Sequence, residues 1–174
     1  MAEPGIDGTT VLSPARRMSK RAIDVFILRS KGWAEFYAGV AGIDDETDKG
    51  DCFERLMQLY MQSAPHMVSH YKNVWLRRDV PGDVKMLLRL PDTDEGIDIV
   101  AETHYGEFHS GQAKFRSNPL QALTMTEIVT FTNLSFVHCR GIKHGLIAHT
   151  CGFPINKREL LGNIAEIGSM CGRS

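Results

Sequence analysis

The stretch 96–116 (GIDIVAETHYGEFHSGQAKFR) constrains the fold of this chain more than any other part of the sequence. Two runs with extended character lie on either side of Tyr105 and Gly106. The first run carries β-branched side chains that favour a strand, namely Ile97, Ile99 and Val100. The stretch therefore predicts a β-hairpin, whose two strands must run antiparallel.

Two helices are predicted before the hairpin. The first covers 13–40, with Ser13 as its N-cap, Pro14 at its first helical position and a break near Gly32. The second covers 45–65 and is closed by Pro65. Its apolar stripe has helical spacing and consists of Phe53, Leu56, Met57 and Tyr60. A strand at 71–76 and a short helix at 83–90, ending before Pro91, follow.

After the hairpin the pattern predicts a helix, a strand and a last helix. The helix at 123–141 ends at Gly141 and carries one apolar face, formed by Ile128, Phe131, Leu134 and Val137. A short buried strand is predicted at 143–150, and a helix at 156–168 with Asn156 as its N-cap. Because a helical crossover delivers its next strand parallel, we expect an α/β sandwich with a central mixed sheet flanked by helices.

Composition fits one globular domain. The chain has 174 residues, of which 43% are apolar, and this is enough for a hydrophobic core. It has no long apolar run and no secretory signal pattern, so we expect a cytoplasmic protein with no membrane partner. The four cysteines form no CxxC pair and are expected to be buried, reduced thiols. A formal net charge of -1 implies that DNA, if bound, is bound locally or with a partner's help.

Three polar residues of the hairpin are candidates for a site. Gln112 and Lys114 are two apart on one strand and therefore share a face. A loop centred on Tyr105 would place Asp98 opposite Gln112, so that all three side chains meet near one end of the sheet. A loop centred between Tyr105 and Gly106 would instead pair residue 98 with residue 113, and convergence would need a bulge. The sequence leaves both registers open.

This set of side chains suits hydrolysis of a phosphodiester. Carboxylate and amide oxygens hold a hard, hydrated cation, and such a cation lowers the pKa of an attacking water. A lysine ammonium can orient that water, help to deprotonate it, or stabilise charge on the phosphate. Glu54, on the second predicted helix, is a candidate for a further carboxylate acting through a water or a second metal.

The order GID at 96–98 and QAK at 112–114 resembles the metal-binding motif of the PD-(D/E)xK nuclease superfamily, in its Mrr-like branch, where Gln often replaces the second acid. The segments 49–62, 74–81, 90–108 and 149–168 are similar to the N-terminal nuclease domain of large bacterial restriction-type helicases. The resemblance covers about residues 47–168. It implies a restriction-endonuclease-like nuclease domain at 47–174, preceded at 1–46 by a leader and extra N-terminal helices.

The resemblance also implies an activity and a set of roles. The activity is that of a Mg²⁺-dependent DNA endonuclease in restriction or defence, with Mn²⁺ able to substitute. Its partner would be a helicase, translocase or DNA-recognition domain in cis or in trans, and a homodimer is also considered. Asp98, Gln112 and Glu54 become the metal ligands, and Lys114 becomes the catalytic lysine. Gln112 departs from the usual acid and gives the metal no charge, which predicts either low metal affinity or the absence of a second metal.

Other residues have weaker interpretations. A literal Pro91-Asp92 pair precedes the motif, and we interpret it as part of a solvated loop. A phosphate track is predicted at Arg116, Lys157 and Arg158.

Two alternative functions stay open. One is a catalytically weak DNA-binding or docking module that keeps the nuclease fold. The other is a zinc-stabilised interaction domain. Its candidate ligands, whose spacing fits no standard zinc pattern, are His138, Cys139, His144, His149 and Cys151.

Overall fold

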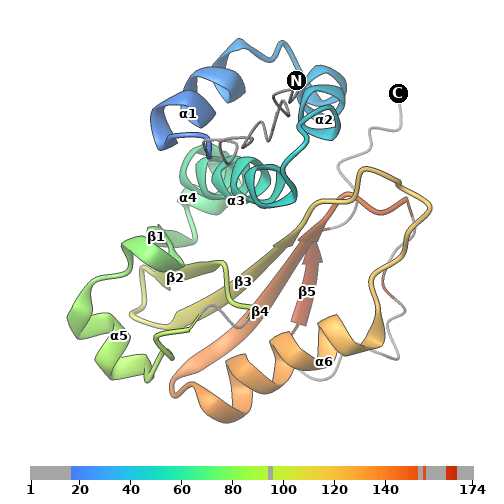
Figure 1. Cartoon of the computed structure of the whole chain (residues 1–174). Coiled ribbons are helices and arrows are strands. Elements are labelled where there is room, and N and C mark those ends of the chain that lie inside the picture. The colour runs from blue at the N-terminus through green and yellow to red at the C-terminus, as the bar shows by residue number, and fades with distance from the viewer. Residues whose placement is uncertain (1–16, 94–95, 153–154, 156–163, 168–174) are drawn as a thin grey trace, which may run out of the picture.

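The chain folds around one mixed β-sheet. The computed structural model describes residues 17–93, 96–152, 155 and 164–167. In this part the sheet has five strands, which lie side by side in chain order (Figure 1). These are β1 (Tyr71–Leu76), β2 (Ile99–Thr103), β3 (Phe108–Lys114), β4 (Ile142–His149) and β5 (Ile164–Ile167). β1, β2 and β3 are antiparallel, whereas β4 and β5 run parallel to β3, so the predicted mixed sheet is confirmed.

The predicted hairpin is confirmed, and its register is the one with a loop centred on Tyr105. Ile99 pairs with Gly111, and the Thr103 amide donates to the carbonyl of Glu107 at 2.8 Å. The turn is closed by the Thr103 hydroxyl, which accepts from the amides of Tyr105 and Glu107. Gly106 takes a φ of 78°, a conformation that favours glycine. This register is the one that sets Asp98 opposite Gln112.

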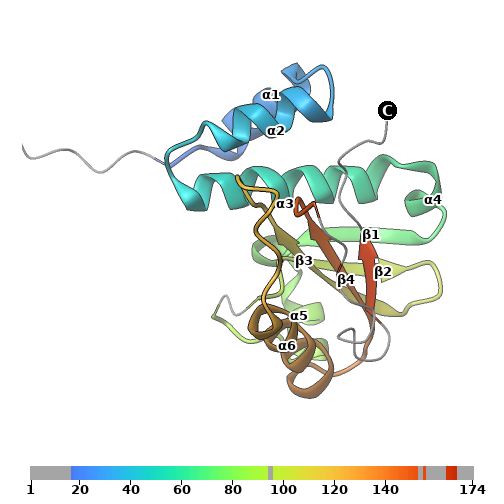
Figure 2. The same ribbon diagram turned by 90° about the vertical axis from the view of Figure 1, so that its right-hand side faces the viewer.

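Four helices cover one face of the sheet: α1 (Lys20–Arg29), α2 (Trp33–Ala41), α3 (Glu46–Ser63) and α4 (Pro65–Val68). Figure 2 shows α3 lying across the sheet, with α1 and α2 stacked on its far side. Asp45 caps α3 by accepting from the amides of Thr47 and Asp48. Phe53 and Met57 of α3 are buried in one hydrophobic core with Phe36 of α2 and with residues of β1 to β4.

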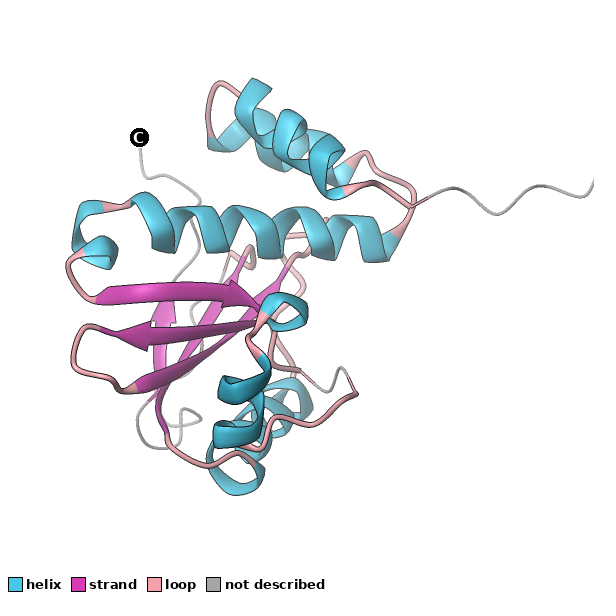
Figure 3. Ribbon diagram, turned by 90° about the vertical axis from the view of Figure 1, so that its left-hand side faces the viewer, coloured by secondary structure: helices cyan, strands magenta, loops and turns pink. Residues whose placement is uncertain are grey.

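Three elements cover the opposite face (Figure 3): α5 (Gly82–Leu88), α6 (Met125–Asn133) and the π-helical turn η2 (Leu134–His138). A short 3-10 helix, η1 (Arg77–Asp79), joins β1 to α5. The second core packs Ile128 and Phe131 of α6 against Val100 of β2 and Ile147 of β4. The sheet is therefore buried on both faces, and polar groups gather at its ends.

Two helix predictions need correction. The first helix begins at Lys20 with Ser19 as its N-cap, because the Ser19 hydroxyl accepts from the Ala22 amide; Ser13 and Pro14 lie outside the described residues. Val137 was predicted on the apolar face of the helix at 123–141, but it is 72% exposed. The reason is that the Cys139 amide bonds to the Leu134 carbonyl, which widens the last turn and rotates Val137 outward.

The predicted last helix is wrong where the structure describes it. Ile164–Ile167 is strand β5, whose register pairs Leu146 with Ala165 and Ile147 with Glu166. A short apolar run has no period that separates helix from strand, and pairing with β4 decides the outcome. Asn156 lies outside the described residues.

The helices of the described part were also compared with the length and hydropathy needed to cross a membrane. None of them meets both requirements.

Candidate active site

The hairpin and β1 bring the motif residues to one end of the sheet. Asp98 directly precedes β2, where its amide donates to Gly111 and its carbonyl accepts from Arg77, both at 2.9 Å. Its carboxylate reaches across to β3, because Oδ2 accepts from the Ala113 amide at 2.7 Å. Ala113 is the middle residue of the QAK motif. The acid of the first strand is thus fixed against the backbone between Gln112 and Lys114.

Gln112 is buried beneath the loop that leads into β2. The residue is 4% exposed. Gly96, in that loop, has a φ of 112°, and a Cβ placed there would lie 3.1 Å from Gln112 Nε2. Gly96 therefore serves both the backbone conformation and the close approach of the amide. The loop and the amide form one packed unit beside Asp98.

Lys114 lies at the end of β3, where the register sets it beside His149 of β4. Its backbone carbonyl accepts from the Thr150 amide at 3.2 Å, which fixes the strand end. The side chain is partly buried, and its ammonium makes no hydrogen bond or ion pair with any residue in the described ranges. A cation on a fixed strand, with no acid already engaging it there, is available to a negatively charged substrate.

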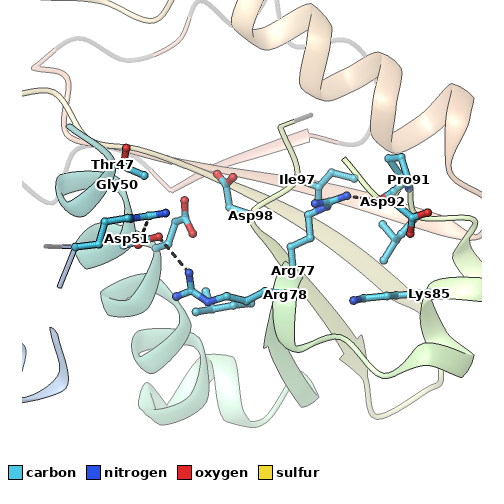
Figure 4. Close-up of a pocket in the computed structure, with 14 residues that line it drawn as sticks. Thr47, Gly50, Asp51, Arg77, Arg78, Lys85, Pro91, Asp92, Ile97 and Asp98 are labelled. Carbon is cyan, nitrogen blue, oxygen red and sulfur yellow. Dashed lines mark hydrogen bonds and ion pairs between the residues drawn. The ribbon is translucent and has the colours of Figure 1, made fainter. Parts of the chain in front are cut away.

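A cavity of about 530 Å³ opens beside Asp98, between α3 and the segment that follows β1. Figure 4 shows Asp98 between Thr47, Gly50 and Asp51 of α3 on one side and Arg77 and Asp92 on the other.

Glu54 also lines this cavity, so two of the predicted acids meet there. Gln112 and Lys114 do not line it and lie on the neighbouring strand. Asp92, interpreted above as part of a solvated loop, is exposed and lines the rim of the cavity.

The cavity also contains basic residues that the sequence reasoning did not assign to this site: Arg17, Arg77, Arg78 and Lys85. Arg77 holds the following loop, because its Nη2 donates to the carbonyls of Pro91 and Thr93. Its Nε is buried without a hydrogen-bond partner among the described residues. The signal available in the sequence was the pair Arg77-Arg78 directly after a buried strand, a place where charged side chains reach a sheet end.

Of the three basic residues predicted to contact phosphate, the structure describes Arg116 alone. Arg116 forms an ion pair with Glu127 of α6, and its amide donates to the Thr150 hydroxyl at 2.6 Å. Burial raises the pKa of Glu127, but hydrogen bonds from Thr124 and Arg116 outweigh it and hold that pKa below its usual value. A phosphate at Arg116 would have to compete with this carboxylate. Lys157 and Arg158 lie outside the described residues.

The thiols and imidazoles proposed for zinc do not gather into a metal site in the described part of the chain. Cys52, Cys139 and Cys151 are buried free thiols, as predicted, and Cys171 lies outside the described residues. Burial raises the pKa of all three thiols, that of Cys52 to about 11. Across the described ranges, no three His, Cys, Asp or Glu side chains form a group that could hold a metal ion.

Solved structures supply one relative of this architecture. The chain is similar to the "ATP-dependent Type ISP restriction-modification enzyme LlaBIII bound to DNA", with 26% sequence identity and a TM-score of 0.55. The similarity covers 76% of this chain but 8% of that chain. Among curated proteins, none matches the chain.

The match with a protein family agrees with the fold and with the position of the motif. A family model described as a restriction endonuclease, of the Mrr type, matches residues 62–162. The matched range is more than half of the chain and includes Asp98, Gln112 and Lys114. The chain therefore belongs to the Mrr-like restriction endonuclease family.

Proposed function

We propose that this chain is a divalent-metal-dependent DNA endonuclease whose active site is built on Asp98, Gln112, Lys114 and Glu54. The hydrogen bond from the Ala113 amide to the Asp98 carboxylate carries the proposal. It ties the acid of one strand to the QAK segment of the next, and Asp98 shares its cavity with Glu54. The family is that of restriction endonucleases, which supports hydrolysis of a nucleic-acid backbone as the reaction.

The donor set fits a hard cation. Asp98 and Glu54 offer carboxylate oxygens in one cavity, and Gln112 offers an amide oxygen on the adjoining strand. Carboxylate and amide oxygens suit Mg²⁺, which keeps several waters, and Mn²⁺ accepts the same oxygens. When bound, such a cation supplies Lewis-acid stabilisation of charge on the phosphate and lowers the pKa of an attacking water.

The chain's own residues contribute position and charge. The Asp98 carboxylate is fixed before substrate arrives, since its Oδ2 is already bonded to the β3 backbone. Lys114 brings an ammonium to the same sheet end, where it would contact a phosphate oxygen or orient the nucleophilic water. Gly96, in the loop that leads into β2, packs closely against the Gln112 amide.

The biological setting that we propose is restriction or defence, with DNA as the substrate and a translocating helicase as the partner. Two observations support it. The chain carries a formal net charge of -1, so it lacks the general positive field that holds DNA without help. The restriction-modification enzyme that it resembles is far longer than this chain, as the 8% coverage shows. A second domain or subunit would deliver the DNA.

A nicking assay tests the proposal. Supercoiled, linear and single-stranded DNA are incubated with the protein in Mg²⁺ or Mn²⁺, with chelator as control. We expect metal-dependent cleavage by the wild type and none by Lys114→Ala or Asp98→Ala, both folded by circular dichroism. A Lys72→Ala variant, which changes an exposed lysine paired with Glu102, should cleave like the wild type. Cleavage retained in Lys114→Ala would overturn the assignment of the lysine.

A further inference from the structure

We propose that Arg17 and Arg78, held by Asp51, form a clamp for a DNA backbone phosphate beside the cleavage position. This inference rests on the proposed nuclease function and extends its site to residues outside the motif. Arg17 precedes α1 and Arg78 belongs to η1, and both line the cavity that contains Asp98 and Glu54. Figure 4 shows the side chains of Asp51 and Arg78 pointing toward each other near Asp98, joined by a dashed line.

Asp51 divides its two oxygens between the two arginines. Its Oδ2 accepts from Arg17 Nη2 at 2.7 Å, and its Oδ1 lies 3.2 Å from Arg78 Nη1. Each guanidinium has five N–H donors, so most donors of both groups stay available to a ligand. The side chains of Arg17 and Arg78 are 57% and 47% exposed, whereas Asp51 is only 14% exposed. The carboxylate is the inner support, and the two guanidinium groups face solvent.

The N-terminal segment is fixed so that Arg17 reaches this position. The Met18 amide, next in the chain, donates to both carboxylate oxygens of Asp48 at 3.1 Å. Asp48 is buried at 5% exposure, and it also lies 3.9 Å from Arg17 Nε. Arg17 lies outside the region 62–162 that the family model matches, so the family match does not reveal its role.

The charge and shape of the clamp fit a phosphodiester. Guanidinium forks match the geometry of phosphate oxygens and bind them with paired hydrogen bonds. Two arginines already oriented by one carboxylate lose less side-chain freedom when a phosphate arrives. Four basic and four acidic residues of the described chain line the cavity, so a divalent cation at the acids would leave the lining net positive. A backbone phosphate next to the scissile one is the ligand that this arrangement fits.

The test measures DNA binding and cleavage in full-length variants. Arg17→Gln and Arg78→Gln are compared with Arg140→Gln, which removes the same charge from an exposed arginine outside the cavity. Binding to a mixed-sequence duplex is measured in Ca²⁺ over a salt series, and cleavage is measured in Mg²⁺. We expect each clamp variant to bind about tenfold more weakly, with a salt slope smaller by about 0.9, and to show a raised KM with little change in kcat. Arg140→Gln should match the wild type.

Two further variants separate a clamp from general charge. Arg78→Lys keeps the charge but loses the fork, so its affinity should fall between those of the wild type and Arg78→Gln, with the salt slope unchanged. Asp51→Asn makes the cavity more positive, and general electrostatics would strengthen DNA binding. We expect weaker binding instead, because the two arginines lose their common support. Tighter binding by Asp51→Asn would refute the positioning role of Asp51.

The outcomes also separate the clamp from the nuclease function. If the wild type binds DNA and its affinity depends on Arg17 and Arg78 but it does not cleave, the clamp stands and the nuclease proposal fails. If the wild type cleaves and both Gln variants bind like Arg140→Gln, the clamp is wrong. A wild type that neither binds nor cleaves DNA overturns both. Thermal melts of all variants confirm folding, since exposed ion pairs contribute little stability.

Discussion

Gln112 shows how much depends on a single side chain at this site. It stands where an acid is usual in the motif, and it is buried beside Gly96. If its amide oxygen is a metal ligand, Gln112→Glu keeps the length and adds charge, so Mg²⁺ affinity should rise and cleavage should persist at lower Mg²⁺. Gln112→Leu removes the oxygen at similar volume and should weaken metal binding and cleavage together.

Isothermal calorimetry with Mg²⁺, paired with nicking assays over a metal titration, checks this prediction. The matched control is Gln62→Glu, which makes the same change on α3, away from the cavity. Unchanged Mg²⁺ affinity in Gln112→Glu, together with full activity in Gln112→Leu, would show that Gln112 only supports the Gly96 loop.

His109, at the opposite end of the sheet, predicts an acid-sensitive fold. It is 4% exposed, its Nδ1 is 3.0 Å from the Tyr71 hydroxyl, and the imidazoles of His70 and His144 lie against its ring. Burial, then the charges of His144 and His70, lower the pKa of His109 to about 4, against 6.5 for an ordinary histidine. The unfolded chain therefore binds a proton more readily than the folded chain between these values.

The contribution of neutral His109 to the free energy of unfolding is complete above pH 6.5 and is lost as the pH falls towards 4. The loss amounts to about 3 kcal/mol in total. Urea unfolding from pH 7.5 to pH 4 measures this loss. His109→Asn should flatten the pH dependence, whereas His138→Asn, a change of an exposed histidine, should leave it in place. Parallel stability curves for the wild type and His109→Asn would contradict the prediction.

At the scale of the elements, the sequence predicts what local periodicity determines. The stripe of α3 has a helical period, and the hairpin around Tyr105 is indicated by extended runs with β-branched residues beside a turn; both are confirmed. Ile164–Ile167 fell inside the helix predicted at 156–168 from its N-cap signal, and its strand identity comes from pairing with β4. The predicted burial of Val137 is wrong for a similar reason, because one π-type hydrogen bond at the end of the helix changes which side chains are exposed.

In the candidate site, too, local patterns could be predicted from the sequence and long-range contacts could not. Asp98, Gln112 and Lys114 could be placed together because strand alternation and one of two hairpin registers bring them to one sheet end. Glu54 was named as a candidate further carboxylate on the second predicted helix, with the resemblance in support, and it lines the Asp98 cavity. Arg17 was not foreseen at this site, because its place depends on how the N-terminal segment packs on α3. Contacts between residues so far apart in the chain leave no periodic pattern in the sequence from which they could be predicted.

At the scale of the whole molecule, the N-terminal helices and the sheet share one hydrophobic core. Ile23 and Val40 of the first two helices are buried in the same core as Phe53 and Leu76. We therefore expect full-length protein to unfold in one transition. Phe36→Ala should lower the stability of the entire chain by about 3–5 kcal/mol, whereas Leu28→Ala, at a side chain that is 82% exposed, should change it little.

A fragment of residues 47–174 tests whether the rest of the fold is stable without the N-terminal helices. It would expose the surface of α3 that Ile23, Phe36 and Val40 cover, and each buried apolar side chain lost costs about 1.5–3 kcal/mol. Since domains of this size are stable by only about 5–15 kcal/mol, the fragment should melt far below the full chain or aggregate. Calorimetry of both forms checks this, and an unchanged melting temperature for the fragment would show that residues 47–174 are stable without the helices before residue 46. Loss of cooperative folding would instead mean that the helices that place Arg17 at the cavity also hold α3, and with it Glu54, against the sheet that carries Asp98.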